Sequence, residues 1–248
     1  MAFKFVTFCA VFFGGFVTQA FAGENAAITV IDPIEFKDTA IQGEIAQSEI
    51  AALYDLPVSM GGNRADGVEL TSPDETQKEM VSTCAQYKAH KDKGWLAMTT
   101  YDLSMESFFK STCGRLDILS SATPAKSDRF GDAPYHLDDL RAYPASFLDP
   151  ITAKGGTLCE GAKTLRECTK QRDGKISIEE NKLHFTDKGY DAYFTPSVKA
   201  DINGDGSEDM IFDYGYHITD GTFLSYGQIC LEWPEGQELI SIINCGIE

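Results

Sequence analysis

The feature that most constrains the fold is an acidic loop that runs directly into a predicted strand. Residues 201–209 read Asp-Ile-Asn-Gly-Asp-Gly-Ser-Glu-Asp, and the residues after them are rich in β-branched and aromatic types. Oxygen-bearing side chains fall at alternate positions, at Asp201, Asn203, Asp205, Ser207 and Asp209. This spacing suits a hard cation such as calcium, which takes about six to eight oxygen ligands. Gly204 and Gly206 permit the sharp turn that such a loop needs.

An EF-hand is disfavoured, because its loop needs a bidentate Glu at the twelfth position and a helix after it. Here Phe212 takes that position and a strand follows. A D-x-N-x-D-G-x-x-D loop before a strand resembles the calcium loops of FG-GAP/VCBS-type repeats, over residues 201–212 only. The resemblance implies a structural calcium ion held by four side chains and the carbonyl of Ser207; the side chains are those of Asp201, Asn203, Asp205 and Asp209. The alternative is an acidic surface turn without metal, although three aspartates in one turn repel each other unless a cation is present.

We expect a secretory signal peptide over residues 1–22. Lys4 precedes an apolar run, and Ala20-Phe-Ala ends the segment with the small-x-small pattern that signal peptidase cleaves. The run is too short to cross a bilayer, and no later segment is long and apolar enough to do so. The sequence therefore predicts a soluble periplasmic or secreted protein with no membrane span.

The strongly acidic composition bears on partners. Loss of Lys4 with the signal takes the formal net charge from -17 to -18. A chain this acidic repels nucleic acid and anionic lipid, so neither is an expected partner. The charge serves solubility, or else it attracts a basic partner.

The cysteines predict a disulfide framework. Of the 7 cysteines, Cys9 lies in the expected signal, which leaves an even number in the exported chain. No C-x-x-C pair is present, so neither zinc binding nor thioredoxin-like chemistry is indicated. Proximity in the sequence favours the pairs Cys84 with Cys113, Cys159 with Cys168, and Cys230 with Cys245.

We predict an α+β protein in which a helical N-terminal part, residues 23–154, is followed by an antiparallel β-sheet in residues 155–248. In the first part we expect a short strand at 27–31, a short helix at 43–53, and a helix over 73–92 that starts with a capping box. Residues Thr99-Thr-Tyr-Asp102 can cap a further helix. Its apolar stripe at helical spacing consists of Met105, Phe108, Phe109, Thr112, Leu116 and Leu119.

Two hairpins are predicted in the C-terminal part. Residues 175–185 alternate with period two around a turn at 180–181, and the alternative reading there is a second EF-hand without its first ligands. The second hairpin turns at Asp220-Gly221. The expected cross-strand partners are Ile178 with Leu183, Ile176 with Phe185, Phe212 with Ile229, Met210 with Leu231, and Gly215 with Tyr226.

The sequence contains none of the common catalytic motifs. His217 is the best catalytic candidate; Asp213 shares its face but lies about 13 Å away along the strand. Asp102 and Glu106 form a possible carboxylate pair on one helix face. We therefore expect a non-enzymatic exported protein with one structural calcium ion, a binding or inhibitor module for another protein or a cell-wall component.

The alternative is a periplasmic hydrolase with its site near His217 on the outer face of the sheet. A deep pocket that gathers His217 with two carboxylates would favour the hydrolase. A flat or convex face would favour the binding module.

Overall fold

The computed structural model describes residues 27–59, 67–128, 130–131, 139–151, 157–179, 181–219 and 224–245. The expected signal peptide and the Asp220-Gly221 turn lie outside these residues. The helices, with η for a 3-10 helix, are η1 (Gln47–Glu49), α1 (Ile50–Leu53), α2 (Cys84–Lys91), α3 (Thr100–Ser121), η2 (Asp139–Arg141), η3 (Ala145–Ile151) and α4 (Leu165–Gln171). The strands are β1 (Ala27–Glu35), β2 (Ala40–Ala46), β3 (Val68–Thr71), β4 (Lys78–Val81), β5 (Lys175–Glu179), β6 (Lys182–Thr186), β7 (Tyr190–Ala200), β8 (Asp209–Ile218), β9 (Leu224–Glu232) and β10 (Ser241–Ile243).

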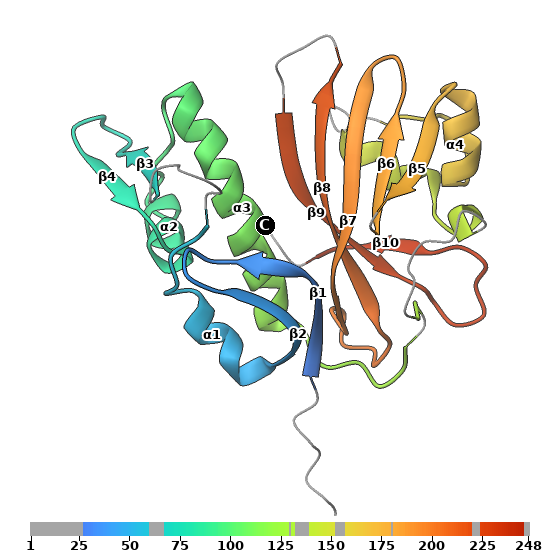
Figure 1. Cartoon of the computed structure of the whole chain (residues 1–248), viewed down its shortest axis with the longest axis horizontal. Helices are drawn as coiled ribbons and strands as arrows, with labels where there is room; N and C mark the ends of the chain where they lie inside the picture. Colours follow the sequence, from blue (N-terminus) through green and yellow to red (C-terminus); the bar gives the residue numbers. More distant parts are fainter. Residues whose placement is uncertain are drawn as a thin grey trace, which may run out of the picture.

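One large antiparallel sheet organises the described chain (Figure 1). Its main path runs in the order β10-β9-β8-β7-β1-β2, and β5 and β6 join it through the pairing of β6 with β7. β3 and β4 form a separate small sheet. The protein is therefore a mixed α/β protein built on an antiparallel sheet, which agrees in outline with the predicted class.

β7 is the strand at which the two parts of the chain meet. One of its edges pairs with β8 along the whole strand. The other edge is shared, because residues 191–194 pair with β6 while Val198 and Lys199 pair with β1. The register shifts between Pro196 and Val198, and proline, which has no N–H for the ladder, is tolerated at such irregular positions. The irregularity falls where the shared edge passes from β6 to β1.

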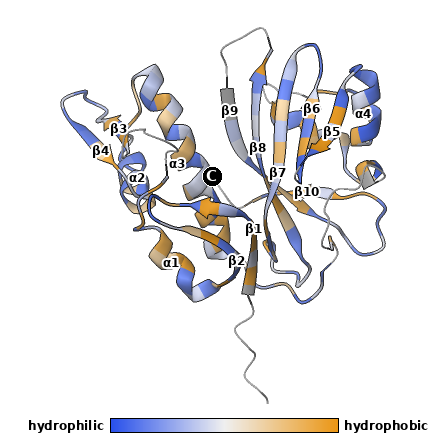
Figure 2. Ribbon diagram, in the orientation of Figure 1, coloured by the Kyte–Doolittle hydropathy of each residue, from blue (hydrophilic) through white to orange (hydrophobic). Residues whose placement is uncertain are grey.

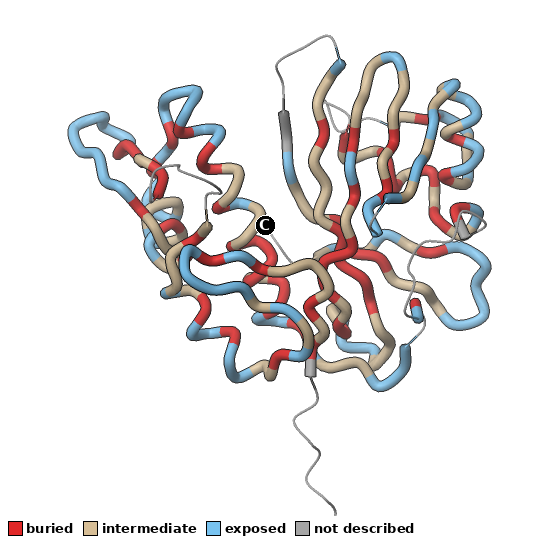
Figure 3. The backbone as a smooth tube through the Cα atoms, in the orientation of Figure 1, coloured by how far each residue is buried: buried red, intermediate tan, exposed pale blue. Residues whose placement is uncertain are grey.

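Each face of the sheet buries its own core, as the alternation along β8 shows. Ile211 belongs to the core beneath α2 and α3, whereas Met210 and Phe212 belong to the core beneath η3 and α4. Neighbouring side chains of a strand point to opposite faces, so one strand supplies both cores. Figure 3 shows buried segments through the middle of β7 and β8 and on one side of α3.

α3 covers the first face of the sheet. Thr99 caps the helix, because its side-chain oxygen accepts a hydrogen bond from the backbone N–H of Asp102. Of the predicted stripe, Met105, Phe109, Leu116 and Leu119 are buried. Phe108 is partly buried against the same core. The predicted cap and apolar face of this helix are confirmed.

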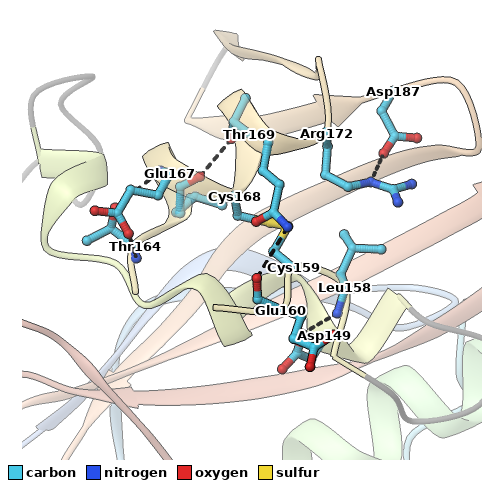
Figure 4. Close-up of a disulfide and its surroundings, with 12 residues drawn as sticks. Asp149, Leu158, Cys159, Glu160, Thr164, Glu167, Cys168, Thr169, Arg172 and Asp187 are labelled. Atoms are coloured by element: carbon cyan, nitrogen blue, oxygen red, sulfur yellow. Dashed lines mark hydrogen bonds and ion pairs between the residues drawn. A yellow bond between two sulfur atoms is a disulfide. The ribbon is translucent and has the colours of Figure 1, made fainter. Parts of the chain in front are cut away.

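α4 lies against the second core and is held by the contacts in Figure 4. A disulfide joins Cys168 of the helix to Cys159, and the Nε of Arg172 donates a hydrogen bond to Asp187 over 2.8 Å. Most of the helix is hydrophilic in Figure 2. A helix this short is marginal in water, so these tertiary contacts stabilise it.

The predicted helical layout of the N-terminal part is not confirmed. β1 to β4 all lie within residues 23–154, and β1 extends the large sheet. The expected strand at 27–31 is confirmed as part of β1. Residues 43–53 hold the end of β2 as well as α1. The strands were underestimated because the sheet that β1 and β2 join is supplied by residues far along the chain.

The helix expected over 73–92 is wrong in its first half. A turn and β4 occupy that half, and α2 begins only at Cys84. The Ser72 hydroxyl, which we expected to cap the helix, donates to Asp74 over 2.6 Å inside the β3–β4 turn. Glu75 has a φ of 58°, a left-handed conformation that cannot continue a helix. The capping-box pattern thus marks a hairpin turn here.

All three predicted disulfides are confirmed. Their Cα–Cα distances are 5.4 Å for Cys84–Cys113, 5.3 Å for Cys159–Cys168 and 5.3 Å for Cys230–Cys245. Such a framework is typical of proteins that fold in oxidising compartments. In the described part of the chain, no helix has the length and apolar character needed to cross a membrane.

Candidate functional site

The acidic loop joins β7 to β8 and is folded around the carboxylate of Asp201. Its Oδ1 accepts the N–H groups of Gly204 and Asp205 at 2.7 and 3.1 Å, and its Oδ2 accepts the N–H of Gly206 at 2.8 Å. Gly204 and Gly206 have φ angles of 82° and 88°, which residues with a side chain rarely adopt. The tight turn predicted from the two glycines is confirmed.

Asp209 is fully buried at the end of this loop. Its Oδ2 accepts the N–H groups of Ile202 and Asn203 at 2.8 and 3.4 Å. Its Oδ1 is buried and has no hydrogen-bond partner among the described residues. Burial raises the pKa of Asp209 to about 7. A buried carboxylate oxygen in this state calls for a proton or a cation.

The other predicted ligands lie in the same loop, but their oxygens face backbone N–H groups. Asn203 Oδ1 accepts the N–H of Asp205 at 3.0 Å, and Asp205 Oδ1 accepts that of Ser207 at 2.7 Å. Within the described ranges, no three His, Cys, Asp or Glu side chains are gathered as metal ligands. The unpartnered oxygen of Asp209 is therefore the one feature of the loop's geometry that fits a cation.

The loop is also attached to the segment that follows α3. Thr123 and Asp201 exchange two backbone hydrogen bonds of 2.7 and 2.8 Å. Lys199 Nζ lies 3.3 Å from the carboxylate of Glu208 and 3.8 Å from that of Asp128. Burial raises the pKa of Glu208 to about 7. Glu208 is thus engaged in an ion-pair cluster with Lys199.

His217 on β8 lies on the side of the sheet that faces α3. Its neighbour across the β7–β8 ladder is Asp191, with 3.6 Å between His217 Nε2 and Asp191 Oδ2. Asp191 Oδ1 also lies 2.6 Å from Nε2 of His184 on β6. The sequence offered Asp213 as the nearest carboxylate to His217 and missed Asp191. Only the register of β7 against β8 could have revealed it, and the long acidic loop and the register shift between Pro196 and Val198 hide that register from the sequence.

A row of side chains crosses four strands beside this cluster. His184, Tyr193, Gly215 and Tyr226 stand opposite one another on β6, β7, β8 and β9. The rings of His184 and Tyr193 are stacked, with centroids 4.1 Å apart and planes 7° from parallel. Tyr193 is 45% exposed and Tyr226 is 43% exposed. Because Gly215 has no side chain, the row has a gap between the two tyrosines.

An open cavity of about 520 Å³ lies between α3 and this face of the sheet. In Figure 1, α3 and the upper ends of β7, β8 and β9 diverge from a common base near β1. The lining includes Asp32, Ser111, Arg115, Lys182, Tyr193, Thr195, Asp213, Gly215, His217 and Tyr226. His217 therefore shares one cavity with two carboxylates, those of Asp32 and Asp213, but the cavity is open and does not have the depth that we set as the criterion for the hydrolase alternative.

Buried polar contacts form the base of this cavity. Arg115 Nη2 on α3 lies 2.6 Å from Oδ2 of Asp213 on β8, and Arg115 Nη1 donates to the carbonyl of Asp32 over 3.0 Å. The Nε2 of Gln228 donates to Asp213 and to the carbonyl of Ser111, over 2.9 and 3.1 Å. Burial raises the pKa of Asp213, and the charge of Arg115 opposes that rise. The carboxylate of Asp213 is thus engaged in joining α3 to the sheet.

The predicted carboxylate pair on α3 has a structural role. Asp102 is hydrogen-bonded to the Thr99 cap through its side chain as well as its backbone. Glu106 is buried, and its carboxylate lies 2.9 Å from Nζ of Lys91 and 3.2 Å from Nζ of Lys110. These lysines line a larger hollow of about 850 Å³ between α2 and α3. Because both lysines are engaged in ion pairs with Glu106, this hollow is a weaker candidate for ligand recognition than the cavity near His217.

Comparison of the chain with models of protein families, with curated proteins and with solved structures gave no match. Function must therefore be inferred from the chemistry of the site.

Proposed function

We propose that this chain is an exported binding protein that holds its ligand in the cavity between α3 and the sheet. The observation that carries the proposal is the pair Tyr193 and Tyr226, half-exposed side chains that line the cavity from the two strands flanking β8. Aromatic side chains on a rigid sheet supply large contact areas at low entropic cost, and pockets that combine them with a few polar groups are typical ligand sites. The three disulfides support export.

The polar groups of the cavity favour binding over chemistry. The carboxylate of Asp213 is engaged with Arg115 and Gln228 at the base of the cavity, so it is poorly placed to act on a ligand. The hydroxyl groups of Ser111 and Thr195 line the cavity, yet in the described residues neither is hydrogen-bonded to a histidine. An activated hydroxyl nucleophile needs such a base beside it.

The test is a thermal-shift screen of the mature protein against separate panels of sugars, peptides and aromatic metabolites, followed by calorimetry of the hits. A ligand that binds only the folded state raises the melting temperature by mass action. We expect Tyr226→Ala to remove the shift. Tyr101→Ala should keep it, because Tyr101 is a 53% exposed tyrosine of α3 outside the cavity lining. A ligand that binds Tyr226→Ala as tightly as the wild type would place its site elsewhere and defeat the proposal.

A periplasmic hydrolase is the second candidate, favoured by the carboxylates that share the cavity with His217. In that function His217 would be the general base towards water, and Asp191, 3.6 Å away, would orient its ring. A bound ligand that the wild type cleaves and His217→Ala binds without cleaving would identify an enzyme. A ligand that the wild type binds and never turns over would exclude one.

We also propose that the 201–209 loop binds one structural calcium ion. The buried, unpartnered Oδ1 of Asp209 supports this, since a cation would replace the missing hydrogen bond. The side chains of Asp201, Asn203 and Asp205 and the carbonyl of Ser207 would complete the ligand set. Bound calcium would clip the β7–β8 turn and the segment after α3 together, away from the cavity.

A further inference from the structure

The gap above Gly215, called the slot below, lies between the side chains of Tyr193 and Tyr226. Tyr193 and Tyr226 stand on the strands on either side of β8, directly opposite Gly215 in register. The strands that carry them are two strand spacings apart, roughly 9.6 Å. Tyr193 is stacked on His184 on its other side, with ring centroids 4.1 Å apart, so its ring is braced from behind. The missing side chain of Gly215 therefore leaves room for one ring from a ligand.

The chemistry of the slot indicates which kind of ring fits. Tyr193, Gly215 and Tyr226 line the same cavity, so a ring bound there contacts the apolar faces of tyrosine side chains. A pyranose ring has C–H faces that can make such contacts and hydroxyl groups around its edge that need hydrogen-bonding partners.

Hydrogen-bonding groups lie on both sides of the slot along the strands. The rung on one side contains Asp191 and His217, and the rung on the other contains Thr195 and Asp213. Carboxylates accept hydrogen bonds, and hydroxyl and imidazole groups can both donate and accept them. The hydroxyl groups around a sugar ring need partners of both kinds. Aromatic walls with a hydrogen-bonding margin match the amphipathic surface of a pyranose.

The charges of the lining favour a neutral ligand. The described lining contains the carboxylates of Asp32 and Asp213 and the cations Arg115 and Lys182. Arg115 is already neutralised by Asp213 over 2.6 Å. An acidic sugar or a phosphate would meet no unpaired guanidinium there, and the acidic chain as a whole would repel it.

We propose that the ligand of this cavity is a neutral carbohydrate, one pyranose ring of which is held between Tyr193 and Tyr226 above Gly215. This inference rests on the proposed binding function and names its ligand class. Neighbouring sugar units would extend along the strands past His217, because the contact of Arg115 with Asp213 closes the cavity on the other side. Such a mode of binding suits a glycan chain better than a free monosaccharide.

The test is calorimetry of the mature protein with defined neutral oligosaccharides: β-1,4-glucan, α-1,4-glucan, mannan and chitin fragments. Uronic-acid oligomers and indole serve as charged and flat comparison ligands. We expect at least one neutral oligosaccharide to bind, and Tyr193→Ala and Tyr226→Ala each to weaken it about tenfold or more. Tyr226→Phe should retain binding, because the ring wall is unchanged.

Gly215→Val is the decisive variant. Valine is better suited than glycine to a strand, so the fold should be retained, while its side chain would enter the slot and abolish sugar binding. Tyr101→Ala is the matched control outside the cavity. No binding by any neutral oligosaccharide at millimolar concentration, or binding that survives Gly215→Val, overturns the inference. A peptide or flat aromatic ligand that is lost in Tyr226→Ala also overturns it, while leaving the proposed binding function intact.

Discussion

The ring of Tyr214 on β8 lies directly over Gly227 on β9, its partner in the ladder. A Cβ atom at position 227 would fall 2.5 Å from the hydroxyl oxygen of Tyr214 and 2.7 Å from Cζ. Tyr214 belongs to the rim of the second core, so its ring cannot move freely. Glycine is thus required at position 227 by the neighbouring side chain and not by its own backbone conformation.

Gly227→Ala should therefore destabilise the protein, by about 1–3 kcal/mol, the usual range for overpacking. Chemical denaturation measures the loss. In the double variant with Tyr214→Leu the clash is absent, so the two substitutions should couple favourably. Strictly additive losses would contradict the proposed contact.

The ion pair between Arg115 and Asp213 should be costly to break from either side. The two side chains are 8% and 16% exposed, so removal of one leaves a largely buried charge. Asp213→Ala should lower the free energy of unfolding by about 3–5 kcal/mol. Replacement of both, as in Arg115→Met with Asp213→Leu, should cost much less than the single change. If the single and double variants lose the same free energy of unfolding, an unpaired buried charge is not the cause of the loss.

Calcium should stabilise the wild-type protein at millimolar concentration, the affinity range of extracellular modules. At a hundredfold excess over the dissociation constant, the gain is about 2.7 kcal/mol. Asp205→Ala should abolish the rise in melting temperature while changing the metal-free value little, since Asp205 is exposed. Glu208→Gln, which alters the neighbouring Lys199 cluster but no predicted ligand, should keep the rise. If calcium does not change the melting temperature of the wild type, the loop is an acidic turn and the proposed calcium site is wrong.

Glu106 should contribute to acid sensitivity. Burial alone would raise its pKa, but contacts with Lys91, Lys110 and Tyr87 lower the pKa below the ordinary value of 4.5. A carboxyl group with a lowered folded-state pKa stabilises the fold above its unfolded pKa and loses that contribution as the pH falls through the folded pKa. Glu106→Gln should therefore be less stable than the wild type at pH 7. The difference should shrink below pH 4.5. A difference that stays constant with pH would show that ionisation of Glu106 does not matter.

The mature protein should contain no free thiol, so titration of the denatured, unreduced protein should read near zero. The Cys84–Cys113 bridge closes the largest loop of the three, with a sequence separation of 29. Loss of such a bridge costs roughly 3.5 kcal/mol by restoring entropy to the unfolded chain. The Cys84→Ala, Cys113→Ala double variant should show that loss in denaturation experiments. The sequence separation of Cys159 and Cys168 is only 9, so removal of that bridge should cost less. If removal of Cys84–Cys113 costs less stability than removal of Cys159–Cys168, the entropic cause is wrong.

The sequence predicted those parts of the fold whose information is local. The β8–β9 register follows from a turn and from the alternation of apolar residues, and Phe212 does face Ile229. Each disulfide joins two cysteines that follow one another in the sequence, with no other cysteine between them. The Thr99 cap of α3 was visible because a cap and an apolar stripe lie within one segment.

The parts that could not be predicted depend on strand registers that no short turn motif fixes, and on tertiary contacts. Asp191 and His217 meet only when β7 and β8 align across the acidic loop. The slot at Gly215 similarly needs the registers of β6, β7, β8 and β9 together. Residues 72–75 carry a helix-start pattern, yet β3 and the tertiary contacts of the hairpin prevail over that local preference.

The shared edge of β7 has a consequence for the order of folding. β1 and β2 can form their hairpin early, because their pairing is local. The partner that brings this hairpin into the sheet is β7, through Thr29 with Lys199 and Val30 with Val198. That closure spans most of the chain, and contacts of such high sequence separation form slowly because the loop entropy must be lost first. A chain that stops before β7 thus leaves its first hairpin with an unpaired edge, open to association with other chains.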